Sequence, residues 1–65
     1  MTYKFLMKKG SKGQEVKRMQ ASLGIDADGI FGSNTKRAVE AFQKAKGLDM
    51  DGIAGPDTLS IMGIP

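Results

Sequence analysis

The chain has no cysteine and no histidine among its 65 residues, and both absences narrow its chemistry. Without cysteine there can be no disulfide bond and no thiol nucleophile. Without either residue there can be no metal site built from nitrogen or sulfur ligands, so a zinc hydrolase is excluded. We therefore expect a chain that needs no metal and no cofactor.

The sequence also lacks length and long apolar runs. Sixty-five residues are enough for one small domain with a small core, and they leave little room for an enclosed active site. No apolar run approaches the ~20 residues that span a bilayer. The N-terminal MTYKFLM carries a lysine and has no small-residue cleavage site, which is unlike a signal peptide. We expect no membrane segment, no export signal and no enzymatic activity.

Charge is unevenly distributed along the chain. The net charge is +3, with residues 1–20 strongly basic and the remainder mildly acidic. A basic lobe attracts polyanions, either nucleic acid or an anionic cell-wall polymer. Its lysines alternate with glycine rather than with stacking aromatic residues, which favours a solvated surface. Nucleic acid is disfavoured as a partner because Lys36, Arg37 and Lys44 have no Gln or Asn companion on the same exposed strip.

A sequence repeat with an offset of 23 residues organises the chain. It aligns GIDADGIFGSNT (24–35) with GLDMDGIAGPDT (47–58). The shared pattern indicates that one loop-to-helix unit is used twice. The first glycine of each copy ends a helix, and the Asp-Gly pair forms a tight turn. Ile30 and Ile53 follow that turn, and we expect both to point into the core.

Three helices are predicted from the apolar spacing and the end signals. The first begins at Ser11, whose hydroxyl caps it in a capping box with Gln14, and it ends before Gly24. The second covers 33–46, and the third begins at Pro56. The residues expected to face inward are Val16, Met19, Gln20, Leu23, Ala38, Val39, Phe42, Ala45, Leu59 and Met62. The alternation in TYKFLM suggests that Tyr3, Phe5 and Met7 form a short extended edge.

The D-x-D-G strings resemble the start of a calcium loop, but the spacing excludes one. In a loop from Asp26 the bidentate twelfth position would be Arg37, and in a loop from Asp49 it would be Ser60. The aspartates are better interpreted as turn formers. Catalysis by Asp28 or Asp51 is disfavoured, because both lie in structural turns that so short a chain cannot shield from water.

Three further features have their own interpretations. Thr35 and Thr58 follow a helix-entering glycine, so we expect their hydroxyls to bond backbone groups of the first helical turn. Gln43 either reaches a loop backbone across the bundle or hydrogen-bonds a ligand. Phe31, which aligns with Ala54, either packs in the core or lines a recess.

Three stretches of the chain carry a family resemblance: KKGSKGQEVKRMQASLGI, DGIFGSNTKRAVEAFQKAKGL and DGIAGPDTLSIM. With these elements, residues 8–62 closely resemble the peptidoglycan-binding domain 1 family. The resemblance implies a three-helix module. Together with the repeat and the alternating N-terminal residues, it leads us to expect an all-α fold, a small three-helix orthogonal bundle with an internal loop-helix repeat and a short extended N-terminal segment. Residues 1–7 would form that extended lead-in, and residues 8–65 the peptidoglycan-binding-like domain.

The resemblance also implies a non-catalytic module that anchors to bacterial peptidoglycan, as a detached cell-wall-targeting domain or a small phage-associated or cell-wall-associated subunit. The partners would be the glycan strand and stem peptide, and also a cell-wall hydrolase or phage tail proteins. The location would be the cell wall, the extracellular space or a phage particle. The alternative is a structural protein–protein interaction subunit of a phage tail or similar assembly that keeps the fold without binding glycan.

A binding groove is predicted in the first copy of the repeat and at the start of the second helix. A glycan–peptide strand offers hydroxyls, acetamides, methyl faces and carboxylates, which require an apolar platform and several polar partners. Phe31 would be the platform, Asn34 a hydrogen-bond partner and Arg37 the fork for a peptide carboxylate. The complete predicted ligand-binding set is Asp28, Phe31, Asn34, Thr35, Arg37 and Gln43.

Overall fold

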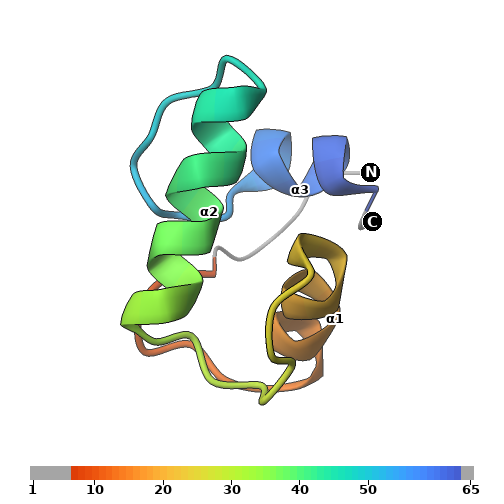
Figure 1. Cartoon of the computed structure of the whole chain (residues 1–65). Coiled ribbons are helices and arrows are strands. Elements are labelled where there is room, and N and C mark those ends of the chain that lie inside the picture. Colours follow the sequence, from red (N-terminus) through yellow and green to blue (C-terminus); the bar gives the residue numbers. More distant parts are fainter. Residues whose placement is uncertain (1–6, 64–65) are drawn as a thin grey trace.

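The computed structural model describes residues 7–63, which form three helices (Figure 1). These are α1 (Gln14–Leu23), α2 (Ser33–Ala45) and α3 (Pro56–Met62). Within the described residues the only extended pairings are two isolated bridges, so the predicted all-α three-helix fold is confirmed. No helix in this range is long and apolar enough to cross a membrane. The expected extended pairing of Tyr3 and Phe5 lies outside the described residues.

Glycine and proline set most helix ends as the sequence predicts. Gly24 and Gly63 end α1 and α3 with φ values of 75° and 81°, a left-handed conformation that costs glycine little because it has no Cβ. Pro56 opens α3 at its first position, where its missing N–H leaves no bond unmade.

The start of α1 differs from the prediction. The helix begins at Gln14 rather than Ser11, and its N-cap residue is Gly13, which makes no side-chain cap. The Ser11 hydroxyl instead accepts the Lys8 N–H at 3.1 Å. The reason is that Ser11 and Gly13 use their backbone groups to pair with the loop before α2, so the chain is still extended where the helix was expected to begin.

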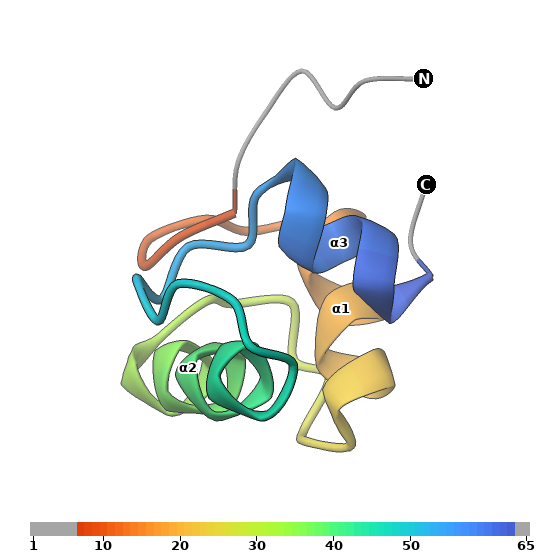
Figure 2. The same ribbon diagram turned by 90° about the horizontal axis from the view of Figure 1, so that it is seen from above.

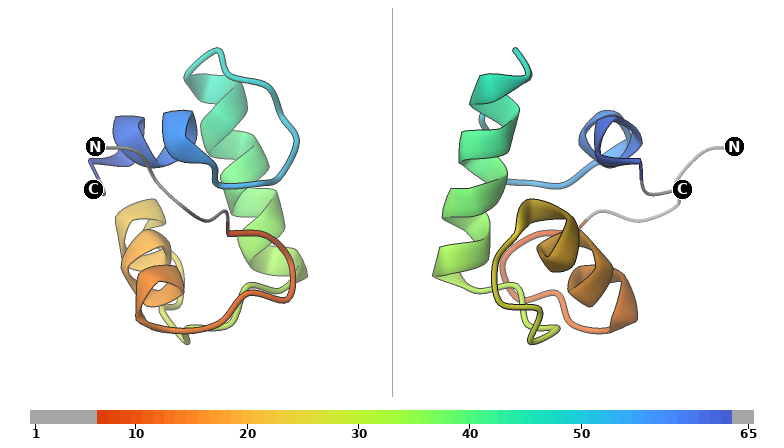
Figure 3. Two further views of the ribbon diagram at one scale, coloured as in Figure 1. Left: turned by 180° about the vertical axis from the view of Figure 1, so that it is seen from behind. Right: turned by 45° about the vertical axis from the view of Figure 1, so that its right-hand side comes forward.

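The three helices pack crosswise around one apolar core (Figure 3). Helix α1 contacts both α2 and α3. Leu23 and Met62 pack against the core from its edge. The buried apolar side chains come from all three helices, from the segments between them and from the segment before α1. They are Met7, Val16, Met19, Phe31, Val39, Ala54 and Leu59.

The segment 7–13 ties the two repeat copies together. Met7 exchanges two backbone hydrogen bonds with Ala54, of 3.1 and 2.7 Å. Further along, Ser11 C=O accepts from Phe31 N–H at 2.9 Å, and Gly13 N–H donates to Gly29 C=O at 3.0 Å. Figure 2 shows this segment running beside the loop that leads into α3. One strand-like segment therefore pairs with the second loop at its start and with the first loop at its end.

Two packing predictions are wrong. Ile30 is 55% exposed, and the buried residue is the next one, Phe31, since the turn and the pairing with residues 10–13 aim that side chain inward. Ala45 is exposed at the end of α2. The buried face of this helix instead follows the four-residue spacing of Thr35, Val39 and Gln43, so two of its three members are polar.

Candidate functional site

Each repeat copy is held by a buried glutamine and its partners, which together we call a glutamine clamp. The first clamp comprises Gln20, Asp28, Gly29, Ile30 and Thr35, and the second comprises Gln43, Asp51, Gly52, Ile53 and Thr58. Both glutamines are 1% exposed. A buried amide needs partners for its donors and its acceptor, and the loop after each glutamine supplies them.

In the first clamp the Gln20 side chain binds its loop at four points. Its Nε2 shares two N–H groups among three acceptors, Asp28 Oδ1 at 2.9 Å, Ile30 C=O at 2.9 Å and Thr35 Oγ1 at 3.0 Å. Its Oε1 accepts the Gly29 N–H at 2.8 Å. The amide therefore fixes both the turn and the first helical turn of α2 to α1.

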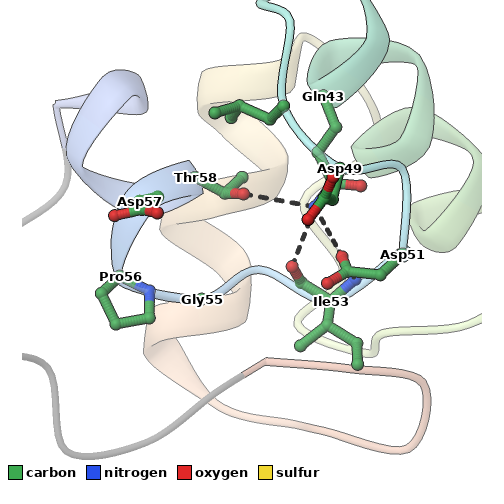
Figure 4. Close-up of a pocket in the computed structure, with 9 residues that line it drawn as sticks. Gln43, Asp49, Asp51, Ile53, Gly55, Pro56, Asp57 and Thr58 are labelled. Atoms are coloured by element: carbon green, nitrogen blue, oxygen red, sulfur yellow. Dashed lines mark hydrogen bonds between the residues drawn. The ribbon is translucent and has the colours of Figure 1, made fainter.

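The second clamp repeats this geometry one unit later in the chain (Figure 4). Gln43 Nε2 lies 2.9 Å from Asp51 Oδ1, 2.9 Å from Ile53 C=O and 3.2 Å from Thr58 Oγ1. Gly52 N–H donates to Gln43 Oε1 at 3.1 Å. Every bond joins residues that lie 23 positions after their counterparts in the first clamp, so the aligned segments make the same contacts.

The hydrogen bonds of the clamps define the roles of Gln43 and the two threonines. Gln43 binds the loop backbone, which was one of its two interpretations. Thr35 does not bond the first turn of its helix as expected. It accepts from Gln20 and donates to Ile30 C=O at 3.3 Å, because its side chain turns back into the clamp. Thr58 likewise accepts from Gln43.

The turns within the clamps stabilise ionised aspartate. The Ile30 N–H and then the Gln20 amide donate to the Asp28 carboxylate, and together they lower its pKa below the ordinary value of 3.8. The Ile53 N–H and the Gln43 amide lower the pKa of Asp51 in the same way. Both carboxylates are therefore anionic at neutral pH, where they serve as turn-fixing acceptors.

A recess of about 350 Å³ lies beside the second clamp, between the end of α2 and the start of α3 (Figure 4). Leu48, Ile53 and Pro56 supply apolar walls. Its other lining residues are Gln43, Asp49, Asp51, Gly55, Asp57 and Thr58. No group of three acidic residues within 7–63 is placed to hold a metal ion.

The six predicted ligand-binding residues do not form one groove. Phe31 is 1% exposed and packs in the core, so in this fold its ring offers no platform to a ligand. Asp28 and Thr35 meet in the first clamp, and Asn34 and Arg37 lie exposed on the first turns of α2. The sixth residue, Gln43, lies in the recess at the other copy.

Sequence reasoning missed the recess although a signal for it was present. The repeat alignment begins at Gly24, but extending it four residues towards the N-terminus aligns Gln20 with Gln43. That pair of glutamines marks both clamps. It makes the loop 48–58 as good a candidate for a binding site as the loop of the first copy. The recess itself depends on how α3 meets the end of α2, which the alignment does not contain.

A sequence profile of the peptidoglycan binding domain family matches residues 12–62. The chain belongs to this family. No curated protein matches it. Its family assignment therefore rests on the profile and on solved structures.

Several solved structures share the fold. The SleB N-terminal domain matches with a TM-score of 0.89 and 29% identity, covering 97% of this chain and 94% of that one. A fused Zn-dependent amidase/peptidase/peptidoglycan-binding domain-containing protein from Clostridium acetobutylicum ATCC 824 matches with a TM-score of 0.88 and 36% identity, over 94% of this chain. The endolysin of Burkholderia AP3 phage matches with a TM-score of 0.85 and 41% identity, over 89% of this chain.

The chain spans only 30% of the Clostridium protein and 24% of the endolysin. It corresponds to one domain of these longer chains. The SleB N-terminal domain, by contrast, is matched over nearly its whole length. The shared unit is therefore the three-helix domain itself.

Replacing either clamp glutamine with leucine is expected to destabilise the domain by about 3 kcal/mol, since buried turn groups lose their partners. The expected result is a lower free energy of unfolding for Gln20→Leu and for Gln43→Leu, measured by urea titration followed by circular dichroism. Gln14→Leu is the matched control, because Gln14 is exposed on α1. A clamp variant as stable as this control would contradict the assignment.

The lowered pKa values of Asp28 and Asp51 predict a loss of stability in acid. A group with a depressed pKa in the folded state stabilises the fold above its unfolded pKa of 3.8, and this stabilisation disappears as pH falls through the folded pKa. Urea titrations between about pH 5 and about pH 2 should show this decline. The Asp28→Asn/Asp51→Asn variant keeps an acceptor oxygen and should decline less steeply. Equal slopes for the variant and the wild type would refute the linkage.

Proposed function

We propose that this chain is a non-catalytic module that anchors to bacterial peptidoglycan through the recess between α2 and α3. The observation that carries the proposal is a recess with apolar walls and exposed carboxylates in a domain of the peptidoglycan binding family. Its location would accordingly be the bacterial cell wall, the extracellular space or a phage particle.

The size of the recess favours weak binding of a repeating polymer unit rather than tight binding of a single ligand. Its volume of about 350 Å³ lies at the small end of the range for ligand cavities. A short part of a glycan–peptide strand would fill it, with its methyl and methylene groups against Leu48 and Pro56. We expect dissociation constants between about 1 μM and about 1 mM, because a small contact area on a flexible polymer gives only about 4–8 kcal/mol.

Weak affinity is useful when the module is linked to another unit. The Clostridium relative is a fused amidase/peptidase, and another relative is a phage endolysin. In such an arrangement the module would hold a hydrolase near its polymeric substrate, and multivalent contact would raise the effective affinity. We extend this role to the chain as a proposal, whether it acts as a detached domain or with a hydrolase or phage tail partner.

Cosedimentation with insoluble peptidoglycan sacculi tests both peptidoglycan binding and the position of the binding site in the domain. Wild-type protein should appear in the pellet, and Asp57→Arg should reduce the pelleted fraction at least about tenfold by filling the recess. Asn34→Arg is the matched control, because Asn34 is the counterpart of Asp57 in the first copy and occupies the same second position of its helix.

The two variants separate the competing site assignments. Loss of binding in Asn34→Arg alone would move the site to the first loop, where sequence reasoning placed it, and would contradict the recess. Wild-type protein that stays in solution at high sacculus concentration would contradict peptidoglycan binding altogether. That result would favour a protein–protein subunit of a phage tail or similar assembly.

A further inference from the structure

The chemistry of the recess lining specifies the kind of group it receives. Three aspartates line it, and no basic side chain does, although the net charge of the chain is +3. In Figure 4, Asp57 lies on the α3 side of the recess, and Asp49 and Asp51 lie on the opposite side. The carboxylates are thus distributed around a cavity rather than gathered at one point.

Most polar groups of the recess other than Asp49 and Asp57 are already hydrogen-bonded within the domain. The Gln43 amide gives its donors and its acceptor to the second clamp. The Oδ1 atom of Asp51 accepts from both Ile53 N–H and Gln43. Asp49 and Asp57 make no side-chain hydrogen bond or ion pair with any residue in 7–63, and both are exposed. The groups free to meet a ligand are therefore carboxylate acceptors.

The first copy shows which features are particular to the recess. Asp57 is the counterpart of neutral Asn34, and Pro56 is the counterpart of Ser33. Relative to the first copy, the second copy thus has one more negative charge and one more apolar side chain at the N-terminus of its helix, α3. Together with Leu48 and Ile53, these changes produce a cavity with apolar sides and an anionic rim.

From this arrangement we infer that the recess recognises a primary ammonium group on an aliphatic stem. Methylene groups of the stem pack against Leu48 and Pro56, and the ammonium donates to the carboxylates of Asp49 and Asp57. This inference rests on the proposed function and deepens it. The part of the cell-wall polymer that is bound is the free side-chain amine of the diamino acid in the stem peptide, not the neutral glycan.

The same geometry argues against a carboxylate ligand. The sequence-based expectation placed Arg37 as the fork for a peptide carboxylate. Arg37 lies on α2 away from the lining set, whereas the cavity presents oxygen acceptors. A carboxylate entering the recess would meet like charge, which disfavours binding.

Chemical acetylation of the polymer tests the inference. Sacculi freed of anionic secondary polymers are divided, and the free amines of one half are N-acetylated with acetic anhydride. Wild-type protein should bind the acetylated sacculi about tenfold more weakly, since each lost charged hydrogen bond removes a large part of a weak affinity. Equal binding to both halves would overturn the inference while leaving the proposed function standing.

Variants of the recess aspartates test whether the effect of acetylation on binding arises in the recess. Asp49→Asn/Asp57→Asn should bind untreated sacculi about tenfold more weakly than wild type, and acetylation should change its binding little. Asp26→Asn is the matched control, because Asp26 is the counterpart of Asp49 in the first copy. A double variant that binds and responds to acetylation like wild type would refute the assignment to Asp49 and Asp57.

A soluble probe separates this inference from the proposed function. Nα-acetyl-lysine methylamide should shift the backbone amide NMR signals of residues 48–58 at millimolar concentration, and its Nε-acetylated form should not. These shifts without sacculus pelleting would support amine recognition and contradict peptidoglycan anchoring. Absence of shifts with the free amine would contradict amine recognition, whatever the pelleting result.

Discussion

The buried glutamine amide is the interaction on which this small fold depends. A domain of this size has few apolar contacts, so its loops need specific polar anchors in place of a larger core. Gln20 and Gln43 each bind a turn, a backbone carbonyl and a threonine of the next helix from within the bundle. A single side chain thereby fixes how the chain reverses after one helix and where the first turn of the next helix lies. The hydrogen bonds are fully matched, since no buried side-chain nitrogen or oxygen in residues 7–63 lacks a partner.

The same clamp is used in two different surroundings, and the recess lies beside only one of them, the second. The first loop is paired along its outer edge by residues 10–13, whereas the second is paired at Ala54 by Met7. The recess lies beside the second loop, where Asp49, Asp57 and Pro56 line its mouth. Duplication thus provides the scaffold, and substitutions at a few positions of one copy give that copy its own surface chemistry. The clamp behind the recess ties its walls to α2 through the hydrogen bonds of the Gln43 amide.

Local signals in the sequence predicted the helices well but not the details that tertiary pairing decides. Gly24 and Pro56 set helix ends through their own backbone preferences, so they were predicted correctly. Ser11 has good capping chemistry, yet it lies in a segment that pairs with a distant loop, and α1 starts later. Ile30 and Phe31 are neighbours with similar hydrophobicity, and only the pairing of that loop decides which one is buried. The aligned glutamines Gln20 and Gln43 were a signal for the clamps, but the recess depends on how α3 meets the end of α2, which the repeat alignment does not contain.

Native-state hydrogen exchange of the Gly29 and Gly52 amides tests the central claim most directly. Both N–H groups lie in loops, where amides ordinarily exchange quickly, but each donates to a buried glutamine oxygen. If the clamps hold the fold together, these two amides exchange only through global unfolding and show protection close to that of the slowest core helix amides. Fast exchange of both amides, with the helices still protected, would show that the loops open independently of the core and would contradict the account.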